Sequence, residues 1–351
     1  MKYLFIVQGE GLGHTTQSIA LRSILEKNGH KVSTTFLGSN FFRKENELYR
    51  SIPHECFYSP FFLHRSDKKG INLFLTFLYN LFLAPIYLFT ILRIAYRIRT
   101  SDVNAIIVFY DMIGQLGSFL SFSAKPVFSV SHHFIFEQPS FIWPSHRKAE
   151  RIMLKIHSWL ASLGAKKKLA LSFTPESNIP TKRLYFVPPL LRHEILDSIP
   201  VEGDHIHIYC LQPGFLDSII NLAKRMPEKE FRVFLHEIKN EPQLPSNVNI
   251  YFISEVKFRK SMTTASLIIC TSGFETPAEA IYLNKPLIVV PSKGHFEQYC
   301  NALDVLRIKA AVVWDSFNID IDPVLKDNPA HDNFVKWISM SEEILLKHLS
   351  E

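Results

Sequence analysis

Two short segments, one at the start of the chain and one in its last third, combine residue types that could bind a nucleotide or move a proton. The first, GEGLGH, follows an apolar stretch at 3–7 and ends in His14. A dinucleotide-binding turn needs a third glycine where His14 stands, and a P-loop needs a lysine that this segment lacks. The segment is therefore a glycine-rich turn between a strand and a helix. Gly9, Gly11 and Gly13 would let a ligand approach the backbone, and His14 would either face a cleft or only cap and pack at the helix start.

The second segment, CTSGFETPAEAIYLNKPLIVVPSKGHFEQYCNA, covers residues 270–302. An apolar strand ends here in a turn made of Ser272, Gly273 and Phe274. The free N–H groups and the dipole of the helix that follows suit a diphosphate. Glu275 and Glu279 are four residues apart and share a helix face, so Glu279 could accept hydrogen bonds from ribose hydroxyls.

The next strand of this segment leads to three polar side chains, those of His295, Glu297 and Gln298. They suit a ligand rich in hydroxyl groups. The segment as a whole predicts a nucleotide-sugar pocket; the alternative is an ordinary polar loop between a strand and a helix.

Three further polar residues follow strands of the first half, at the sheet edge where His14 is expected. Asp111 follows the strand at 105–109 and could orient the His14 imidazole, accept the proton itself, or cap a helix. His132 and His133 follow the next strand and could bind an acceptor or merely pack. We expect no metal site here, because a third ligand, a carboxylate or thiolate, is not near in the sequence.

Length and composition indicate a globular protein of about two domains. The chain has 351 residues, of which 47% are hydrophobic, and this excludes disorder. The apolar run at the start is too short for a signal peptide, so we expect a cytoplasmic protein. Four widely spaced cysteines predict reduced thiols and neither a zinc site nor a disulfide framework.

The net charge of +6 is unevenly distributed along the chain. Residues 1–190 have 23 Lys and Arg against 11 Asp and Glu, a net +12, whereas residues 191–351 have 16 against 22, a net −6. No nucleic-acid-binding motif accompanies the basic clusters. The asymmetry therefore favours an anionic membrane surface, and no nucleic acid, as the partner of the N-terminal half.

Apolar strand-like segments alternate with helical ones, which predicts βαβ units and parallel sheets. The expected strands are 3–7, 31–37, 105–109, 126–130, 205–211, 231–236, 248–253, 266–271 and 286–291. A proline-rich stretch without clean periodicity separates two groups of them. The α/β chain thus divides into Rossmann-like domains at 1–190 and 205–351, with a linker at 191–204.

Residues 71–92, INLFLTFLYNLFLAPIYLFTIL, contain no charged side chain and are long enough to cross a bilayer. If the strands before and after this stretch pair in one sheet, both of its ends lie on the same side of the membrane, so a single span is excluded. Asn72, Thr76 and Asn80 recur every four residues and would face the domain. We expect a helix or helical hairpin lying in the membrane interface, with Arg93, Arg97 and Arg99 at its edge; the alternative is a helix buried in the core or in a dimer contact.

The pattern S-G-x-x-T-x-x-E-A-x-x-x-x-x-P-x-x-x-x-P, followed by F-E-Q-x-x-N-A, resembles the donor-binding half of GT-B glycosyltransferases. The similar branch is family 28, which contains the N-acetylglucosaminyltransferase of lipid-linked peptidoglycan precursors and related diacylglycerol glucosyltransferases. The opening G-x-G-x-G-H resembles the N-terminal glycine loop of that branch. The resemblance covers nearly the whole chain and implies two Rossmann-like domains facing each other across a cleft.

The resemblance also implies roles for individual residues. Glu279 matches the ribose-binding glutamate, Ser272 and Gly273 match the turn beside the diphosphate, and Glu297 with Gln298 matches the pair that holds the donor sugar, His295 being adjacent. Ile253 stands where the family supports the base. The segment LQPGF, with Gln212 and Gly214, stands where the family often has a glycine-rich diphosphate loop, but it keeps only one glycine, and Pro213 removes an N–H donor.

This resemblance implies that the chain is a hexosyltransferase that moves a sugar from a nucleotide sugar to a lipid-linked or glycan acceptor. The expected donor is a UDP-sugar. The implied reaction inverts the anomeric carbon, needs no metal or other cofactor, and occurs at the cytoplasmic membrane face. His14 is the expected base, and Gly11, Gly13, His132 and His133 would contact the acceptor. Two alternatives remain at this point: a catalytically silent GT-B partner protein, and a nucleotide-sugar 2-epimerase.

Overall fold

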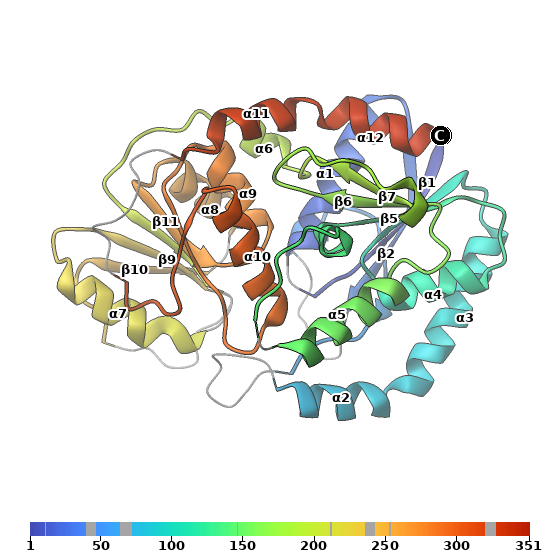
Figure 1. The fold of residues 1–351 in the computed structure, drawn as a ribbon, viewed down its shortest axis with the longest axis horizontal. Coiled ribbons are helices and arrows are strands. Elements are labelled where there is room, and N and C mark those ends of the chain that lie inside the picture. Colours follow the sequence, from blue (N-terminus) through green and yellow to red (C-terminus); the bar gives the residue numbers. More distant parts are fainter. Residues whose placement is uncertain are drawn as a thin grey trace.

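Parallel strands alternate with helices and assemble into two sheets, which lie side by side in Figure 1. The computed structural model describes residues 1–10, 12–39, 47–63, 72–145, 147–210, 213–235, 243–252, 254–319 and 328–351. Within these residues the first sheet has the order β3-β2-β1-β4-β5-β6-β7 and the second the order β10-β9-β8-β11-β12-β13. Every recorded pairing of neighbouring strands in both sheets is parallel.

The first sheet consists of β1 (Lys2–Val7), β2 (Lys31–Ser39), β3 (Glu55–Tyr58), β4 (Ala105–Phe109), β5 (Val127–Ser131), β6 (Lys167–Leu171) and β7 (Leu184–Val187). The second consists of β8 (Ile206–Tyr209), β9 (Phe231–Leu235), β10 (Val248–Phe252), β11 (Leu267–Thr271), β12 (Leu287–Val290) and β13 (Val312–Val313). The nine predicted strands are thus confirmed to within two residues at each described end. The predicted α/β class with two Rossmann-like sheets is also confirmed.

Four strands escaped the sequence pattern: β3, β6, β7 and β13. They are only two to five residues long, and β6 begins with two lysines, which conceal its apolar end. Lys167 is nevertheless buried in that strand, since its ammonium group donates to the carbonyl of His348 and to Glu351.

The helices cover both faces of each sheet. They are α1 (Gly13–Lys27), α2 (Leu73–Phe82), α3 (Ala84–Thr100), α4 (Met112–Leu120), α5 (Lys148–Leu160), α6 (His193–Leu196), α7 (Leu216–Arg225), α8 (Glu255–Thr263), α9 (Glu275–Tyr282), α10 (Phe296–Arg307), α11 (His331–Ser339) and α12 (Ser341–Ser350). Alternate residues of β1 separate two cores. Phe5 packs with α1 in a core that continues into the second sheet, whereas Ile6 packs with α3 and α4.

The order of each sheet reverses at one point, between β1 and β4 in the first sheet and between β8 and β11 in the second. In open parallel sheets, ligands bind beyond the carboxyl ends of the strands at such a reversal. The turn that ends in His14 follows β1, and the turn at Ser272 follows β11. The sequence therefore places both chemically interesting turns at the reversal points.

The apolar stretch near residue 80 forms two helices, as the predicted hairpin required. Asn72 caps α2 by accepting a hydrogen bond from the Leu75 N–H, and Pro85 lies in the first turn of α3. Among the described residues, no single helix is long and apolar enough to span a bilayer. Together α2 and α3 have the length and composition of a span, but the chain bends by 62° between them. The flanking strands β3 and β4 belong to one sheet, which is the premise on which the single span was excluded.

The chain passes between the two sheets twice. The first crossing follows β7 and includes α6. The second is made by α11 and α12, which run along the top of Figure 1 from the second sheet back to the first. The Trp337 indole of α11 donates to the carbonyl of Ser172, and Glu342 of α12 accepts from Lys27. The last helix of the predicted domain 205–351 thus packs on the N-terminal sheet, and the boundary at 191–204 stays a prediction.

Gly9, in the turn after β1, lies close to Gly38 of β2. A Cβ atom added at Gly9 would lie 1.6 Å from the carbonyl oxygen of Gly38. The same atom at Gly13 would meet only the Cγ of Glu275, at an ordinary 3.4 Å. The contact with Gly38 therefore requires a glycine at position 9, and the approach of a ligand to this turn stays a prediction.

We expect Gly9→Ala to destabilise the protein by about 1–3 kcal/mol, because the added methyl group meets a backbone carbonyl that cannot rotate away. The measurement is the free energy of unfolding in denaturant. Gly13→Ala is the matched control, and its unfolding free energy should stay within about 0.5 kcal/mol of the native value. Equal stability of the two variants would contradict this account of Gly9.

Candidate active site

Turns from the two sheets meet at one place. The Gln17 side chain of α1 donates a hydrogen bond to Glu275 at the start of α9, with 2.6 Å between Nε2 and Oε1. The His132 ring, after β5, stacks on the ring of Phe274, with 4.5 Å between centroids and 6° between planes. The sequence-predicted residues of the first and second halves are therefore brought into direct contact.

The orientation of His14 is set by a relay that crosses between the halves. Its Nδ1 lies 3.1 Å from the Oε1 of Gln17, and a carbonyl oxygen can only accept, so Nδ1 carries the proton and Nε2 keeps its lone pair. The Gln17 amide nitrogen in turn donates to Glu275. Gln17 is three residues beyond His14 on a helix, a spacing that could have identified it from the sequence.

Burial in the first place, and the nearby His132 in the second, lower the pKa of His14 to about 4, although the Gln17 hydrogen bond acts in the opposite direction. The imidazole is therefore neutral at pH 7. With Nδ1 already donating, the Nε2 lone pair is available to accept a proton.

The carboxyl group of Glu275 has the opposite shift. Burial raises its pKa to about 8. Its Oε1 accepts from Gln17, whereas Oε2 is buried and has no hydrogen-bond partner among the described residues. The group is thus mostly protonated at pH 7, and a neutral acid stands in the first turn of α9.

This shift predicts a pH-dependent stability. The folded pKa of about 8 lies above the unfolded value near 4.3, so only the folded state keeps this proton between these values. The stability that Glu275 contributes therefore falls as pH rises through this window. We expect the Tm of the native protein, relative to that of Glu275→Gln, to fall by about 3 °C or more between pH 5 and pH 9. Parallel Tm curves for the two proteins would contradict the assignment.

His132, His133 and Glu297 form a compact group in which two halves of the chain meet. The Nε2 atoms of the histidines lie 3.4 Å and 3.0 Å, respectively, from the two carboxylate oxygens of Glu297 on α10. Although burial alone would raise the pKa of Glu297, the two imidazoles hold it well below its usual range. Burial lowers the pKa of His133 to about 3. At neutral pH the group thus contains a carboxylate beside the neutral imidazole of His133.

Two aromatic residues that the sequence did not single out complete this group. The Tyr110 ring stacks on His133, with 3.9 Å between centroids and 11° between planes, and contacts the ring of His157 edge-on at 4.9 Å. Tyr110 has a φ of 53°, which is uncommon for a bulky residue and is typical of sites where the backbone is constrained for function. A tyrosine directly after an apolar strand was the available signal.

Asp111 is a helix cap. Its Oδ1 accepts from the N–H of Gly114 at the start of α4, and its Oδ2 accepts from the Ser59 hydroxyl at 2.5 Å. The side chain is fully buried. The prediction that Asp111 orients the His14 imidazole is therefore wrong, because Gln17 makes that hydrogen bond.

Glu279 is engaged inside the protein. Its carboxylate is 2% exposed and accepts two hydrogen bonds from Arg192, with Nη2 at 2.8 Å and Nε at 3.2 Å. Arg192 lies in the stretch taken as the linker, where no motif marked it. The ribose-binding role of Glu279 stays a prediction.

The turn at Gly273 leaves room beside the backbone. A Cβ added at Gly273 meets nothing within 4 Å. Next to it, Ser272 donates to the carbonyl of Gln298, and the Gln298 side chain accepts from the N–H of Ser292. Gln298, which is 3% exposed, therefore holds the turn, and its contact with the donor sugar stays a prediction.

Of the remaining predicted residues, two lie within the described part of the chain and three lie outside it. Gly214 lies in a short 3₁₀ helix (Pro213–Phe215) ahead of α7, and the His295 ring lies 5.9 Å from the ring of Phe62 in the first half. The predictions for Gly11, Gln212 and Ile253 lie outside the described residues.

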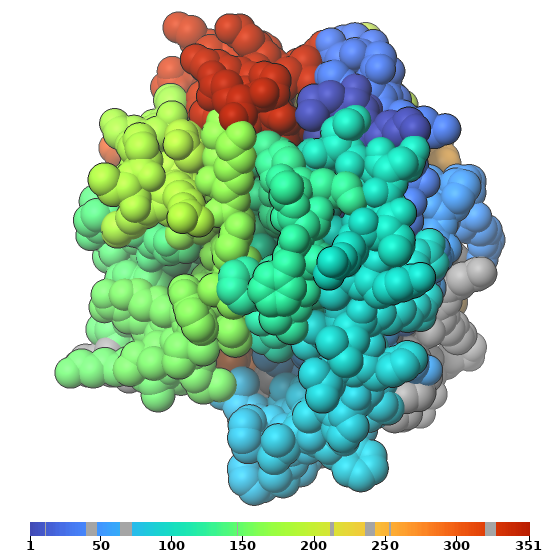
Figure 2. Space-filling view, turned by 90° about the vertical axis from the view of Figure 1, so that its right-hand side faces the viewer, coloured from blue at the N-terminus to red at the C-terminus, as the bar shows by residue number. Residues whose placement is uncertain are grey.

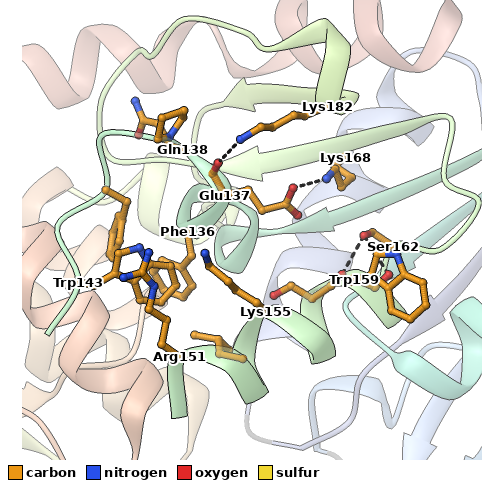
Figure 3. A pocket seen from close by; sticks show the side chains of 14 residues that line it. Phe136, Glu137, Gln138, Trp143, Arg151, Lys155, Trp159, Ser162, Lys168 and Lys182 are labelled. Atoms are coloured by element: carbon orange, nitrogen blue, oxygen red, sulfur yellow. Dashed lines mark hydrogen bonds and ion pairs between the residues drawn. The ribbon is translucent and has the colours of Figure 1, made fainter. Parts of the chain in front are cut away.

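A separate pocket of about 390 Å³ lies next to this site in the first half (Figure 3). Its cations are Arg151, Lys155, Lys168 and Lys182, and its aromatic residues are Phe136, Phe141, Trp143 and Trp159. Lys168 pairs with Glu137, and Lys182 donates to the Glu137 carbonyl. Arg151 and Lys155 lie over the Trp143 ring, at 4.6 Å and 5.4 Å from its centroid.

Two Rossmann-like sheets with polar turns meeting between them define a protein of the GT-B architecture. A family model described as glycosyl transferase family 1 matches residues 1–327, and the chain belongs to that family. It is therefore a glycosyltransferase that uses a nucleotide sugar. An uncharacterized glycosyltransferase of Methanosarcina acetivorans is 22% identical over 329 residues, which cover 86% of this chain and 82% of that protein.

Solved structures with a similar fold include several GT-B proteins. UGT2 of Phytolacca americana, solved with UDP-2-fluoro-glucose and pterostilbene, has a TM-score of 0.61 at 13% identity, over 99% of both chains. UDP-GlcNAc 2-epimerase of Neisseria meningitidis has 0.63 at 13%, also over 99% of both. MurG of Acinetobacter baumannii has 0.53 at 16%, over 99% of this chain and 94% of the other. At these identities the likeness shows the fold alone, and the family 28 branch stays a prediction.

Proposed function

We propose that the protein transfers a hexose from a UDP-sugar to a hydroxyl group of a lipid-linked acceptor, with inversion, at the cytoplasmic face of the membrane. The relay from His14 through Gln17 to Glu275 carries this proposal. It presents a neutral imidazole with a free Nε2 lone pair beside the turn that is expected to hold the donor diphosphate.

On the acceptor side, His14 removes the proton. Its Nε2 accepts hydrogen from the acceptor hydroxyl while the oxygen attacks the anomeric carbon, and Nδ1 continues to donate to Gln17. The low pKa of about 4 makes His14 a weak base, which favours proton transfer late in the attack, when the hydroxyl proton has become acidic. The nearby stacked pair of Tyr110 and His133 forms a rigid wall for the acceptor.

On the donor side, α9 stabilises the leaving diphosphate. The space beside Gly273 adjoins the start of α9, where the first N–H groups of a helix lack intrahelical partners and the helix dipole favours negative charge. An ionised carboxylate at the first helical residue would repel this charge. The raised pKa of Glu275 keeps that residue neutral and so removes the repulsion.

The two helices α2 and α3 supply a surface that fits a membrane. Their exposed apolar residues are Leu73, Phe74, Leu75, Phe77, Leu78, Leu81, Phe82, Leu88, Phe89, Leu92 and Tyr96. Such a concentration on one face of a water-soluble domain marks an interaction site. The polar stripe faces the protein instead, since Thr76 is buried and Asn80 bonds the carbonyl of Phe61. In Figure 2, α2 protrudes at the bottom of this face, below α3 in cyan.

The expected basic edge of this surface differs from the sequence prediction. Arg93 and Arg97 both pair with Glu55, which neutralises part of their charge. The cationic pocket of Figure 3 supplies another basic region, and α5 beside it exposes Ile152, Met153, Ile156 and Trp159. An anionic headgroup in this pocket would leave its acyl chains beside these exposed apolar side chains of α5, which supports a lipid-linked acceptor.

The donor is identified by thermal shift against UDP-, GDP- and dTDP-sugars, and transfer is then measured with the sugar nucleotide that binds. We expect His14→Ala to lower kcat about 10²- to 10⁴-fold, the range of general base catalysis, with donor affinity within about threefold of native. His193→Ala, which removes an exposed histidine with 62% of its side chain accessible, is the matched control and should keep full turnover. Full turnover in His14→Ala would refute the assignment, and a protein unmoved by every nucleotide sugar would favour a silent binding role.

The membrane surface is tested by sedimentation with anionic liposomes. We expect Phe77→Glu combined with Phe89→Glu to weaken binding at least about tenfold. The variant no longer buries two phenylalanine rings in the membrane interface, and the anionic lipids repel its two new carboxylates. Phe252→Glu is the control, because Phe252 of the second half is 64% exposed, similar to Phe77 at 63% and Phe89 at 69%. This variant should bind liposomes as the native protein does. Equal binding of all three proteins, or no binding by the native one, would contradict the membrane surface.

A further inference from the structure

Three side chains at the junction of the two halves have the types and spacing of a transition-metal site. The ligand atoms of His132, His133 and Glu297 all lie within 4.8 Å of one another. The two nitrogen-to-oxygen separations, 3.4 Å and 3.0 Å, are close to the spacing of about 3.3 Å that ligands take around tetrahedral zinc at bonds of about 2.0–2.2 Å. Small side-chain movements would thus suffice to ligate an ion.

The histidines are held so that their ring edges converge on Glu297. The His132 ring stacks on Phe274 and the His133 ring on Tyr110, and both imidazoles are 4% exposed. The Nδ1 of His133 is hydrogen-bonded to the Ser131 hydroxyl at 2.7 Å, which directs its Nε2 at the carboxylate. A hydrogen bond to the far nitrogen is the usual way in which proteins orient a ligating histidine.

His132 supplies a second, independent observation. Neither of its ring nitrogens has a hydrogen-bond partner among the described residues, although the ring is almost fully buried. Its Nε2 lies near Glu297 but does not meet the geometry of a hydrogen bond. Buried polar groups are nearly always satisfied, and an ion between Nε2 and the carboxylate would satisfy this one.

The ligand set selects the kind of metal. Two imidazoles and one carboxylate suit zinc and other late first-row divalent ions, whereas magnesium and calcium prefer oxygen ligands alone. Three protein ligands leave one position open for water or a substrate oxygen. This position is near His14, whose ring centroid lies 5.8 Å from that of His133.

We propose that His132, His133 and Glu297 bind one divalent transition-metal ion, zinc in the first place, which links the two halves of the chain beside the active site. The sequence argument against a metal site required a third ligand near the histidine pair. Glu297 is that ligand, brought there by the fold. From the sequence we expect that no metal is needed to stabilise the diphosphate, whose expected place is the start of α9. The proposed ion has a different place, on the acceptor side of the site.

The test uses the full-length protein after dialysis against a chelator and does not depend on transfer activity. Titration with Co²⁺ should produce the visible absorption of a four-coordinate ion, saturating at one ion per chain, and Zn²⁺ should abolish that absorption. Addition of Zn²⁺ should also raise the Tm, since an ion that binds only the folded state stabilises it.

Glu297→Gln keeps the size of the side chain and removes the anionic ligand, and His133→Ala removes one imidazole. Both should weaken Co²⁺ and Zn²⁺ binding at least about 100-fold, while His193→Ala, the exposed control, should bind as the native protein does. If either variant fails to fold, the native protein's Co²⁺ spectrum and Zn²⁺-dependent Tm decide. A native protein without both signals, or a folded Glu297→Gln that binds as tightly as native, would overturn the proposal.

Discussion

The packing of Phe274 fixes the relation between the two halves of the molecule. This residue belongs to the turn after β11, yet it is 5% exposed because its ring lies between His132 and Phe173 of the first half. It belongs to one apolar core that runs without interruption from the first sheet into the second. Gly273 and Glu275 flank it directly. The turn that offers room to a diphosphate and the carboxyl that meets Gln17 are therefore both positioned by one aromatic side chain.

The site combines groups whose charges are set by burial more than by pairing. Removal from water lowers the pKa of His14, His133 and His157 and raises that of Glu275, so all four are largely neutral at pH 7. Glu297 keeps its charge because imidazole nitrogens surround it. Glu297 thus places a localised negative charge beside these neutral side chains. Such an environment strengthens any electrostatic contact that a bound donor or ion makes there.

The sequence predicted the elements well because the buried parallel strands are continuous apolar runs and the turns after them are polar. It also placed His14 and the turn at Ser272 at the correct edges. Side-chain partnerships were beyond its reach: Gln17 and Glu275 are 258 positions apart, and nothing local marks Arg192 as the partner of Glu279. The close contact of Gly9 was hidden for the same reason, since its neighbour Gly38 comes from β2. Glycine-rich turns look alike whether a ligand or a strand approaches them.

The return of α12 to the first sheet limits how the two halves can move. Lys167 and Lys27 hold this helix through Glu351 and Glu342, respectively. Two covalent connections therefore join the halves, one after β7 and one at α11. Any separation of the two halves would therefore have to bend both connections at once and break the contacts of α12 with the first sheet.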